Sequence, residues 1–268
     1  MSVYRNDNPV FLKQALDSIC ERQTKRPDEI VIIVDGPVSD EIWAVLNSFV
    51  KQNENIAKCY PQTTNRGLGE ALRIGSELCS GDYIFRMDAD DISDSKRFEI
   101  QSRYLEEHPD VDVLGATIAE FNDSLNEPNL RKRVCFSNHD DIVKMSKKRN
   151  PMNHVTTCIK KSSLLNSGGY LPLPYVEDYY LWIRMISKGF KMANTNDVLV
   201  YVRVGNGFEK RRGKKEQISS WRVLQKYMLD NGMVTKKEAR KNMFYIKAFV
   251  NSPVWLKKFY YSVFLRKK

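Results

Sequence analysis

A run of six residues at 29–34, Glu-Ile-Val-Ile-Ile-Val, restricts the fold more than any other feature of the sequence. Continuous β-branched runs are typical of strands that are buried on both faces of a parallel sheet. Weaker strand patterns follow at 56–60 and 82–87, and segments with apolar residues at helical spacing lie between them, at 39–49 and 67–79. This alternation predicts an α/β fold with a mostly parallel sheet flanked by helices.

Acidic residues stand where two of these predicted strands end. Asp35 follows the first strand pattern, and Asp88, Asp90 and Asp91 follow the third. Ligands of parallel α/β sheets bind beyond the carboxyl ends of the strands. Three carboxylates within four residues repel one another unless a cation neutralises them, and Mg²⁺ and Mn²⁺ prefer carboxylate oxygens. We favour a divalent metal site here over a solvated acidic turn that caps the following helix.

Three further positions have both a functional and a purely structural interpretation. Asp35 can bind a ribose or a base edge, or it can be a turn residue ahead of Gly36. Arg66 precedes a predicted helix, where it can contact a diphosphate together with the helix N-terminus, or it can be a surface residue beside a cap. Glu177 and Asp178 open another predicted helix, where the helix dipole favours acids. One carboxylate at the mouth of a nucleotide site can equally serve as a general base.

The positive charge of the chain is concentrated at its C-terminal end. The whole chain has a formal net charge of +10, but residues 205–268 hold 17 Lys and Arg against 4 Asp and Glu, so the preceding residues are slightly acidic. After a cationic loop at 208–215, the remaining residues have the spacing of three amphipathic helices. We therefore predict an α/β domain over 1–205 and a basic helical extension over 206–268.

The basic extension has three interpretations: a solvated surface, a nucleic-acid-binding surface, or an anchor on a membrane surface. No nucleic-acid-binding motif accompanies the charge, which disfavours nucleic acid as a partner. Aromatic residues stand beside Lys and Arg in the expected helices, as they do in helices that lie on anionic lipid. We favour the membrane surface.

Other features disfavour a secreted or membrane-spanning protein. No basic-then-apolar leader opens the chain, and no apolar run approaches the ~18–20 residues of a transmembrane helix. The five cysteines are widely spaced without a CxxC pair, so we expect buried thiols in a reducing compartment rather than disulfides or a zinc site. These features predict a cytoplasmic location.

Several motifs occur in order along the chain, at 2–4, 8–19, 27–36, 65–69, 86–91, 168–170 and 177–182. As an ordered set they resemble those of family 2 glycosyltransferases of the GT-A fold, similar to bacterial enzymes that build exopolysaccharide or O-antigen repeat units. The resemblance covers residues 1–205, which it identifies as a GT-A catalytic domain. Family members usually carry several apolar residues before the first motif, whereas Met1 alone precedes it here. Either the first strand is short or the native chain starts upstream.

On the donor side, the resemblance implies a nucleotide-sugar, most often a UDP-sugar, and a Mn²⁺ or Mg²⁺ ion. It places Tyr4 beside the base and Asp35 at the uracil or ribose. It assigns the metal and the donor diphosphate to Asp88 and Asp90, with Asp91 adjacent.

On the acceptor side, the resemblance assigns the catalytic base to Asp178, with Glu177 in support. The metal and Arg66 would stabilise the departing nucleotide diphosphate, while Asp178 removes a proton from the acceptor hydroxyl. One displacement of this kind inverts the anomeric centre. The QxxRW-type motif of processive members is missing, which favours transfer of a single sugar, and Arg211 and Arg212 of the cationic loop can clamp the diphosphate instead.

The expected acceptor is a polyprenyl-diphosphate-linked saccharide, with the enzyme peripheral on the inner face of the cytoplasmic membrane. Two alternatives stand beside this reading. A sugar-phosphate nucleotidyltransferase uses a related α/β fold and an acidic metal site, but the sequence lacks a Gly-rich basic loop near its first strand. A non-catalytic basic module that binds membrane or nucleic acid is the second alternative.

Overall fold

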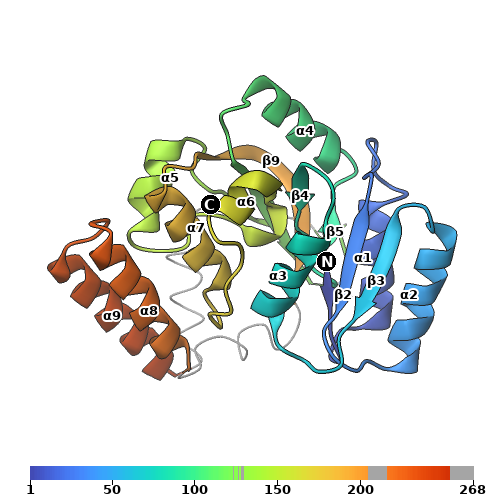
Figure 1. The fold of residues 1–268 in the computed structure, drawn as a ribbon, viewed down its shortest axis with the longest axis horizontal. Helices are drawn as coiled ribbons and strands as arrows, with labels where there is room; N and C mark the ends of the chain where they lie inside the picture. Colours follow the sequence, from blue (N-terminus) through green and yellow to red (C-terminus); the bar gives the residue numbers. More distant parts are fainter. Residues whose placement is uncertain (123, 126, 128–129, 205–215, 254–268) are drawn as a thin grey trace.

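A computed structural model describes residues 1–122, 124–125, 127, 130–204 and 216–253. Its first sheet is parallel, with the strand order β1-β2-β3, and three helices cover it (Figure 1). The elements of this part are β1 (Ser2–Val3), α1 (Pro9–Ile19), β2 (Ile30–Val34), α2 (Asp40–Gln52), β3 (Ala57–Pro61) and α3 (Leu68–Leu78).

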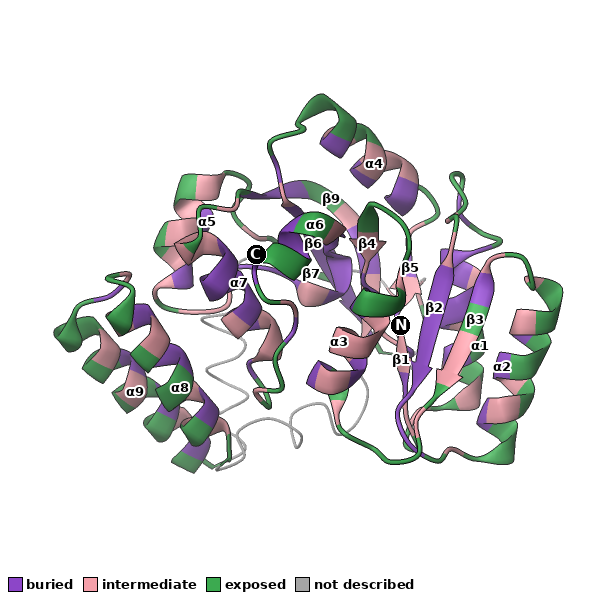
Figure 2. Ribbon diagram, viewed as in Figure 1, coloured by how far each residue is buried: buried purple, intermediate pink, exposed green. Residues whose placement is uncertain are grey.

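Strand β2 forms the centre of the first sheet and is buried along its whole length (Figure 2). Successive side chains of a strand point to opposite faces. Ile30, Ile32 and Val34 pack with α1 and α2, whereas Val31 and Ile33 pack with α3. Burial on both faces is why the run at 29–34 lacks polar alternation.

A second, mixed sheet continues the fold, with the order β4-β8-β6-β9-β5 and with β7 paired to β6. Strands β6 and β9 are parallel, and the other pairs of this sheet are antiparallel. Its elements are β4 (Tyr83–Phe85), β5 (Ile92–Ser93), α4 (Arg97–Glu107), β6 (Val113–Phe121), β7 (Arg131–Arg133), α5 (His139–Ser146), a 3₁₀ turn (His154–Thr156), β8 (Cys158–Lys160), α6 (Lys161–Asn166), α7 (Glu177–Ser187) and β9 (Met192–Arg203).

The prediction of an α/β fold with parallel strands and flanking helices is confirmed, but β4 differs from its expected place in the parallel series. Tyr83 pairs antiparallel with Lys160 and Phe85 with Cys158. A cavity of about 370 Å³ separates this strand from the first sheet, bordered by Met1 and Val31 on one side and β4 on the other.

The C-terminal helices α8 (Glu216–Asp230) and α9 (Lys236–Asn251) pack against each other beside α7 (Figure 1). Leu224 and Met228 lie in one core cluster with Tyr179 and Ile183 of α7. The apolar side of α8 is therefore covered by protein. The expected third helix of this part and the cationic loop with Arg211 and Arg212 lie outside the described residues.

Candidate functional site

Three carboxylates converge directly after β4. One oxygen from each of Asp88, Asp90 and Asp91 lies within 4.8 Å of the others. Asp91 is 3% exposed, and its Oδ1 accepts the backbone N–H of Arg203 at 2.9 Å. Burial, followed by the charges of Asp88 and Asp90, raises the pKa of Asp91 well above its usual range. Asp88 and Asp90 are only half-buried, so they are the more accessible members of the cluster.

The donor set of this cluster fits a hard divalent cation. Carboxylate oxygens are the ligands that Mg²⁺ and Mn²⁺ prefer. A cation would favour the ionised form of Asp91, whose pKa is raised by burial and by the charges of Asp88 and Asp90. Asp88 and Asp90 would hold the ion, because the carboxylate of Asp91 is already bound by the backbone N–H of Arg203 at the end of β9.

Arg203, the last residue of β9, holds the acidic turn in place. Besides its backbone bond to Asp91, its Nε donates to the carbonyl of Asp90 at 3.2 Å, and its Nη2 donates to Gln14 at 2.8 Å. The guanidinium lies 3.8 Å from the ring centroid of Phe11. Arg203 is not among the site residues expected from the sequence, where it stands as a cation directly after the apolar run at 198–202.

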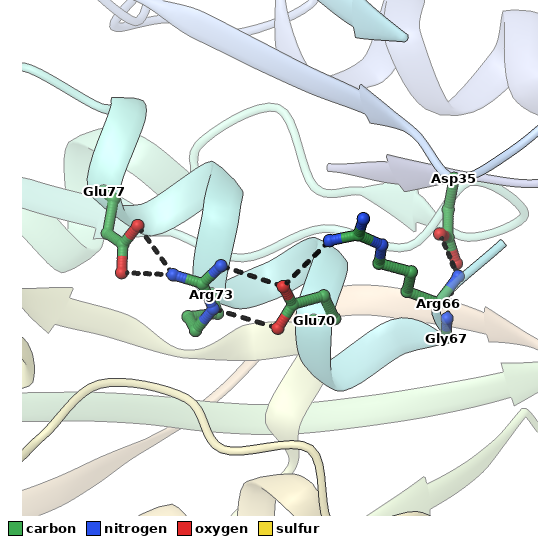
Figure 3. Close-up of polar contacts among 6 residues, drawn as sticks. All are labelled: Asp35, Arg66, Gly67, Glu70, Arg73 and Glu77. Atoms are coloured by element: carbon green, nitrogen blue, oxygen red, sulfur yellow. Dashed lines mark hydrogen bonds and ion pairs between the residues drawn. The ribbon is translucent and has the colours of Figure 1, made fainter. Parts of the chain in front are cut away.

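Asp35 fastens the end of β2 to the loop before α3 (Figure 3). Its carboxylate accepts the backbone N–H groups of Arg66 at 2.8 Å and Gly67 at 2.9 Å, and Asn65 donates to its carbonyl at 3.0 Å. Besides the role at a base or ribose that the resemblance implies, the carboxylate therefore holds the backbone of this loop in place. Gly36 makes the approach possible, because its φ is +85° and a Cβ there would lie 2.6 Å from the Asn65 nitrogen.

Gly36→Ala is expected to lower the free energy of unfolding by about 2–4 kcal/mol, because the substitution combines an unfavourable φ with a backbone clash. Urea denaturation measures the loss. Gly232→Ala is the matched control, since Gly232 has a φ of +67° but no atom within 4 Å of the added Cβ. The control should lose only about 1–2 kcal/mol. Equal losses in the two variants would show that the contact with Asn65 is unimportant.

The side chain of Arg66 is 59% exposed and only loosely held. Its Nη1 lies 3.9 Å from Glu70, which is itself bound by Arg73 at 2.8 Å, and Arg73 also pairs with Glu77 (Figure 3). A long, exposed ion pair contributes little stability. Among the described residues, the Arg66 side chain at the start of α3 therefore has only this weak ion-pair partner.

Glu177 and Asp178 begin α7 and have different environments. Asp178 accepts a hydrogen bond from Asn150 Nδ2 at 2.6 Å and another from the backbone N–H of Tyr179 at 2.7 Å. Glu177 Oε2 is buried and has no hydrogen-bond partner among the described residues. Burial, followed by the charge of Asp178, raises the pKa of Glu177 to about 7. Burial also raises the pKa of Asp178, and the bond from Asn150 opposes that shift.

Contacts connect this acidic pair with the first sheet and with β4. A Cβ on Gly69, in the first turn of α3, would lie 3.1 Å from Pro172 Cα and 3.6 Å from Glu177 Cβ. Arg86, just after β4, is close enough for its charge to lower the pKa of both Glu177 and Asp178. The start of α3, the residue after β4 and the start of α7 therefore lie near one another.

Two further residues, Tyr4 and His154, have defined hydrogen-bond partners. Tyr4 follows β1 directly, and its backbone N–H donates to Asp7 at 2.9 Å. His154 Nε2 lies 2.9 Å from the hydroxyl of Tyr170, and burial lowers the pKa of this histidine well below its usual range. His154 is thus a buried, hydrogen-bonded residue.

The chain matches a known protein family over more than half of its length. The family described as "Glycosyl transferase family 2" matches residues 1–167. The amylovoran biosynthesis glycosyltransferase AmsE of Erwinia amylovora is 39% identical over 80% of this chain and 78% of its own length. An Escherichia coli protein named UDP-Gal:alpha-D-GlcNAc-diphosphoundecaprenol beta-1,3-galactosyltransferase is 37% identical over 80% of this chain and 76% of its own.

Among solved structures, Staphylococcus aureus TarS 1-349 in complex with UDP-GlcNAc superposes with a TM-score of 0.68 at 14% sequence identity. The match covers 99% of this chain and 75% of that chain. At such low identity the likeness shows the fold, which is GT-A.

Proposed function

Since this chain belongs to glycosyl transferase family 2, we propose that it is a metal-dependent, inverting enzyme that transfers one sugar from a UDP-sugar to a polyprenyl-diphosphate-linked saccharide. Its broader activity, glycosyl transfer in bacterial polysaccharide biosynthesis, follows from the relatives. The observation that carries the finer proposal is the convergence of Asp88, Asp90 and Asp91 within 4.8 Å at the end of β4. The name of the Escherichia coli relative supports the choice of a UDP-linked donor and a lipid-linked acceptor.

A divalent ion held by Asp88 and Asp90 would offset the negative charge that develops on the departing diphosphate. Arg66 lies at the N-terminus of α3, where a helix favours anions, and its exposed guanidinium can contact the same diphosphate. Arg211 and Arg212 are proposed to assist from the cationic loop. Tyr4 and Asp35, at the ends of the first two strands, are proposed to lie beside the base and ribose.

Asp178 is proposed to remove the proton from the attacking acceptor hydroxyl. Asn150 fixes the orientation of its carboxylate, and burial raises its pKa, which makes the ionised carboxylate a stronger base. Glu177 is proposed to support this role as the adjacent carboxyl, whose pKa is raised by burial and by the charge of Asp178. Attack on the sugar from the side opposite the leaving diphosphate inverts the anomeric centre.

A nucleotide-release assay tests the proposal. The protein is incubated with a panel of UDP-sugars, a synthetic GlcNAc-diphosphate-lipid acceptor, and Mn²⁺, Mg²⁺ or EDTA. We expect UDP release that requires a divalent ion, the acceptor and one preferred sugar. In a parallel incubation with UTP and sugar phosphates, release of diphosphate would instead identify a nucleotidyltransferase. A protein that is inactive in both incubations would be a binding module.

The acceptor proposal places the protein on the inner face of the cytoplasmic membrane, with α9 toward the lipid. No described helix is both long and apolar enough to cross a bilayer. Phe244 and Tyr245 of α9 are 68% and 58% exposed. Exposed cations accompany them on the same helix: Lys236, Lys237, Arg240, Lys241 and Lys247. Exposed aromatics among cations are typical of helices that bind anionic lipid.

A double substitution of Phe244 and Tyr245 by glutamate should weaken binding to vesicles that contain an anionic phospholipid by about tenfold or more, because it removes apolar contact and adds negative charge. Vesicle sedimentation measures the change. Val10→Glu is the control, since Val10 is 62% exposed on the opposite part of the fold, in α1. Equal binding by the double variant and the original protein would rule out this face as the anchor.

A further inference from the structure

Arg86 is a buried cation directly beside the acidic cluster. It follows β4, is 7% exposed, and donates from Nη1 to Asp88 Oδ2 in a short ion pair. Asp88 is therefore paired with a cation that belongs to the chain itself.

The Arg86 guanidinium has hydrogen-bonding capacity left. It carries five N–H donors, and the buried Nε has no hydrogen-bond partner among the described residues. A buried donor without an acceptor is unfavourable, so the group is suited to a further anionic partner. Arg86 also lies near the catalytic pair, since its charge acts on Glu177 and Asp178.

The partners of Asp88 and Asp91 differ in kind. Asp91 is bound by the backbone N–H of Arg203, which is fixed in β9. Asp88 is bound by a side chain, and a side chain can change its partner by rotation about its own bonds. Asp88 is also the more exposed acid, with a side chain that is 36% exposed. Asp88 is thus the member of the cluster whose present partner a metal ion can replace.

We propose that Arg86 is the resident cation of the metal site: it holds Asp88 in the free protein, releases it when a divalent ion binds with the donor, and then donates to the donor diphosphate. This inference rests on the proposed function. The exchange balances charge, because Asp88 passes from the guanidinium to the metal while the guanidinium gains a phosphate oxygen. No covalent bond changes. Metal alone should bind weakly, and metal with nucleotide should bind much more tightly.

Arg86→Gln tests the exchange through two affinities that should move in opposite directions. Without nucleotide, Mn²⁺ should bind about tenfold more tightly, because Asp88 no longer has a competing cation. At saturating Mn²⁺, UDP should bind about tenfold more weakly, because its diphosphate loses the guanidinium. Paramagnetic resonance of free Mn²⁺ measures the first affinity, and calorimetry measures the second. Arg103→Gln is the charge-matched control at an exposed arginine paired with Glu99, and neither affinity should change.

A merely structural role for Arg86 would weaken both affinities, so unchanged or weaker Mn²⁺ binding by Arg86→Gln overturns the inference. If that variant does not fold, Arg86→Lys decides, because it keeps the charge without the planar fork. It should bind Mn²⁺ within about twofold of the original protein and UDP several-fold more weakly, and unchanged UDP binding overturns the inference. An original protein that binds no Mn²⁺ even in the presence of UDP would overturn the metal-dependent function as well. If the original protein binds Mn²⁺ and UDP as expected but Arg86→Gln does not shift the two affinities in opposite directions, only the role of Arg86 is overturned.

Discussion

Asp178→Asn should reduce sugar transfer by about a thousandfold, because the substitution removes the proton acceptor while keeping the size of the side chain. The binding of UDP should change little, since the proposed base contacts the acceptor and not the nucleotide. Initial rates of UDP release with the lipid-linked acceptor measure the first quantity, and calorimetry with UDP and Mn²⁺ measures the second. Asn150 can still contact the new side chain through its amide, so the start of α7 should keep its structure.

Glu177→Gln is the matched comparison for this prediction. It removes a neighbouring carboxyl whose pKa is about 7 without removing the proposed base, so we expect a loss of about tenfold. If Asp178→Asn retains normal turnover while Glu177→Gln loses it, the two assignments must be exchanged. The distinction matters because Glu177, rather than Asp178, has the buried oxygen without a hydrogen-bond partner among the described residues.

Asp90→Ala should weaken Mn²⁺-dependent UDP binding by about a hundredfold, because a metal ion with few protein ligands depends strongly on each. Calorimetric titrations with UDP in Mn²⁺ and in EDTA measure the effect. In EDTA, the variant and the original protein should bind UDP equally weakly.

Asp140→Ala serves as the control for charge, since Asp140 is exposed in the first turn of α5. Its UDP affinity should match that of the original protein in both buffers. Tight UDP binding by the original protein in EDTA would contradict a metal-dependent donor site, whatever the behaviour of the Asp90 variant.

Local sequence patterns predicted the first sheet well because its determinants are local. The β-branched run at β2 is buried on both faces, and the side chain of Asn8 caps α1 by accepting the N–H groups of Val10 and Phe11, with Pro9 at the first helical position. The capping box of Thr235 and Glu238 likewise begins α9. Each of these signals lies within a few residues of the element it determines.

Partners distant in the sequence explain what the patterns did not reveal. Strand β4 pairs with β8, whose residues lie more than seventy positions later, so its direction of pairing cannot be read from its own composition. Arg203 binds Asp91 although it lies 112 positions later in the chain, and Asn150 reaches Asp178 only through the fold. Arg86 was visible as a charge at the end of an apolar strand, but its ion pair with Asp88 requires coordinates.

The resemblance to family 2 glycosyltransferases of the GT-A fold is confirmed by the family match and by the relatives. The prediction of amphipathic helices in the C-terminal part is confirmed for α8 and α9, but the apolar side of α8 packs against protein. Leu224 and Met228 contact α7 instead of facing outward, because helical periodicity shows that a face is apolar and not what covers it.

Helix α7 carries Glu177 and Asp178 in its first turn, and its side packs against the helix pair α8 and α9. On the proposed membrane orientation, the height of the reaction centre above the lipid is therefore set by packed side chains and not by a flexible tether. On this proposal, an acceptor whose saccharide is too short or too long would present its hydroxyl at the wrong height, and we expect acceptor length to determine specificity separately from the shape of the sugar pocket.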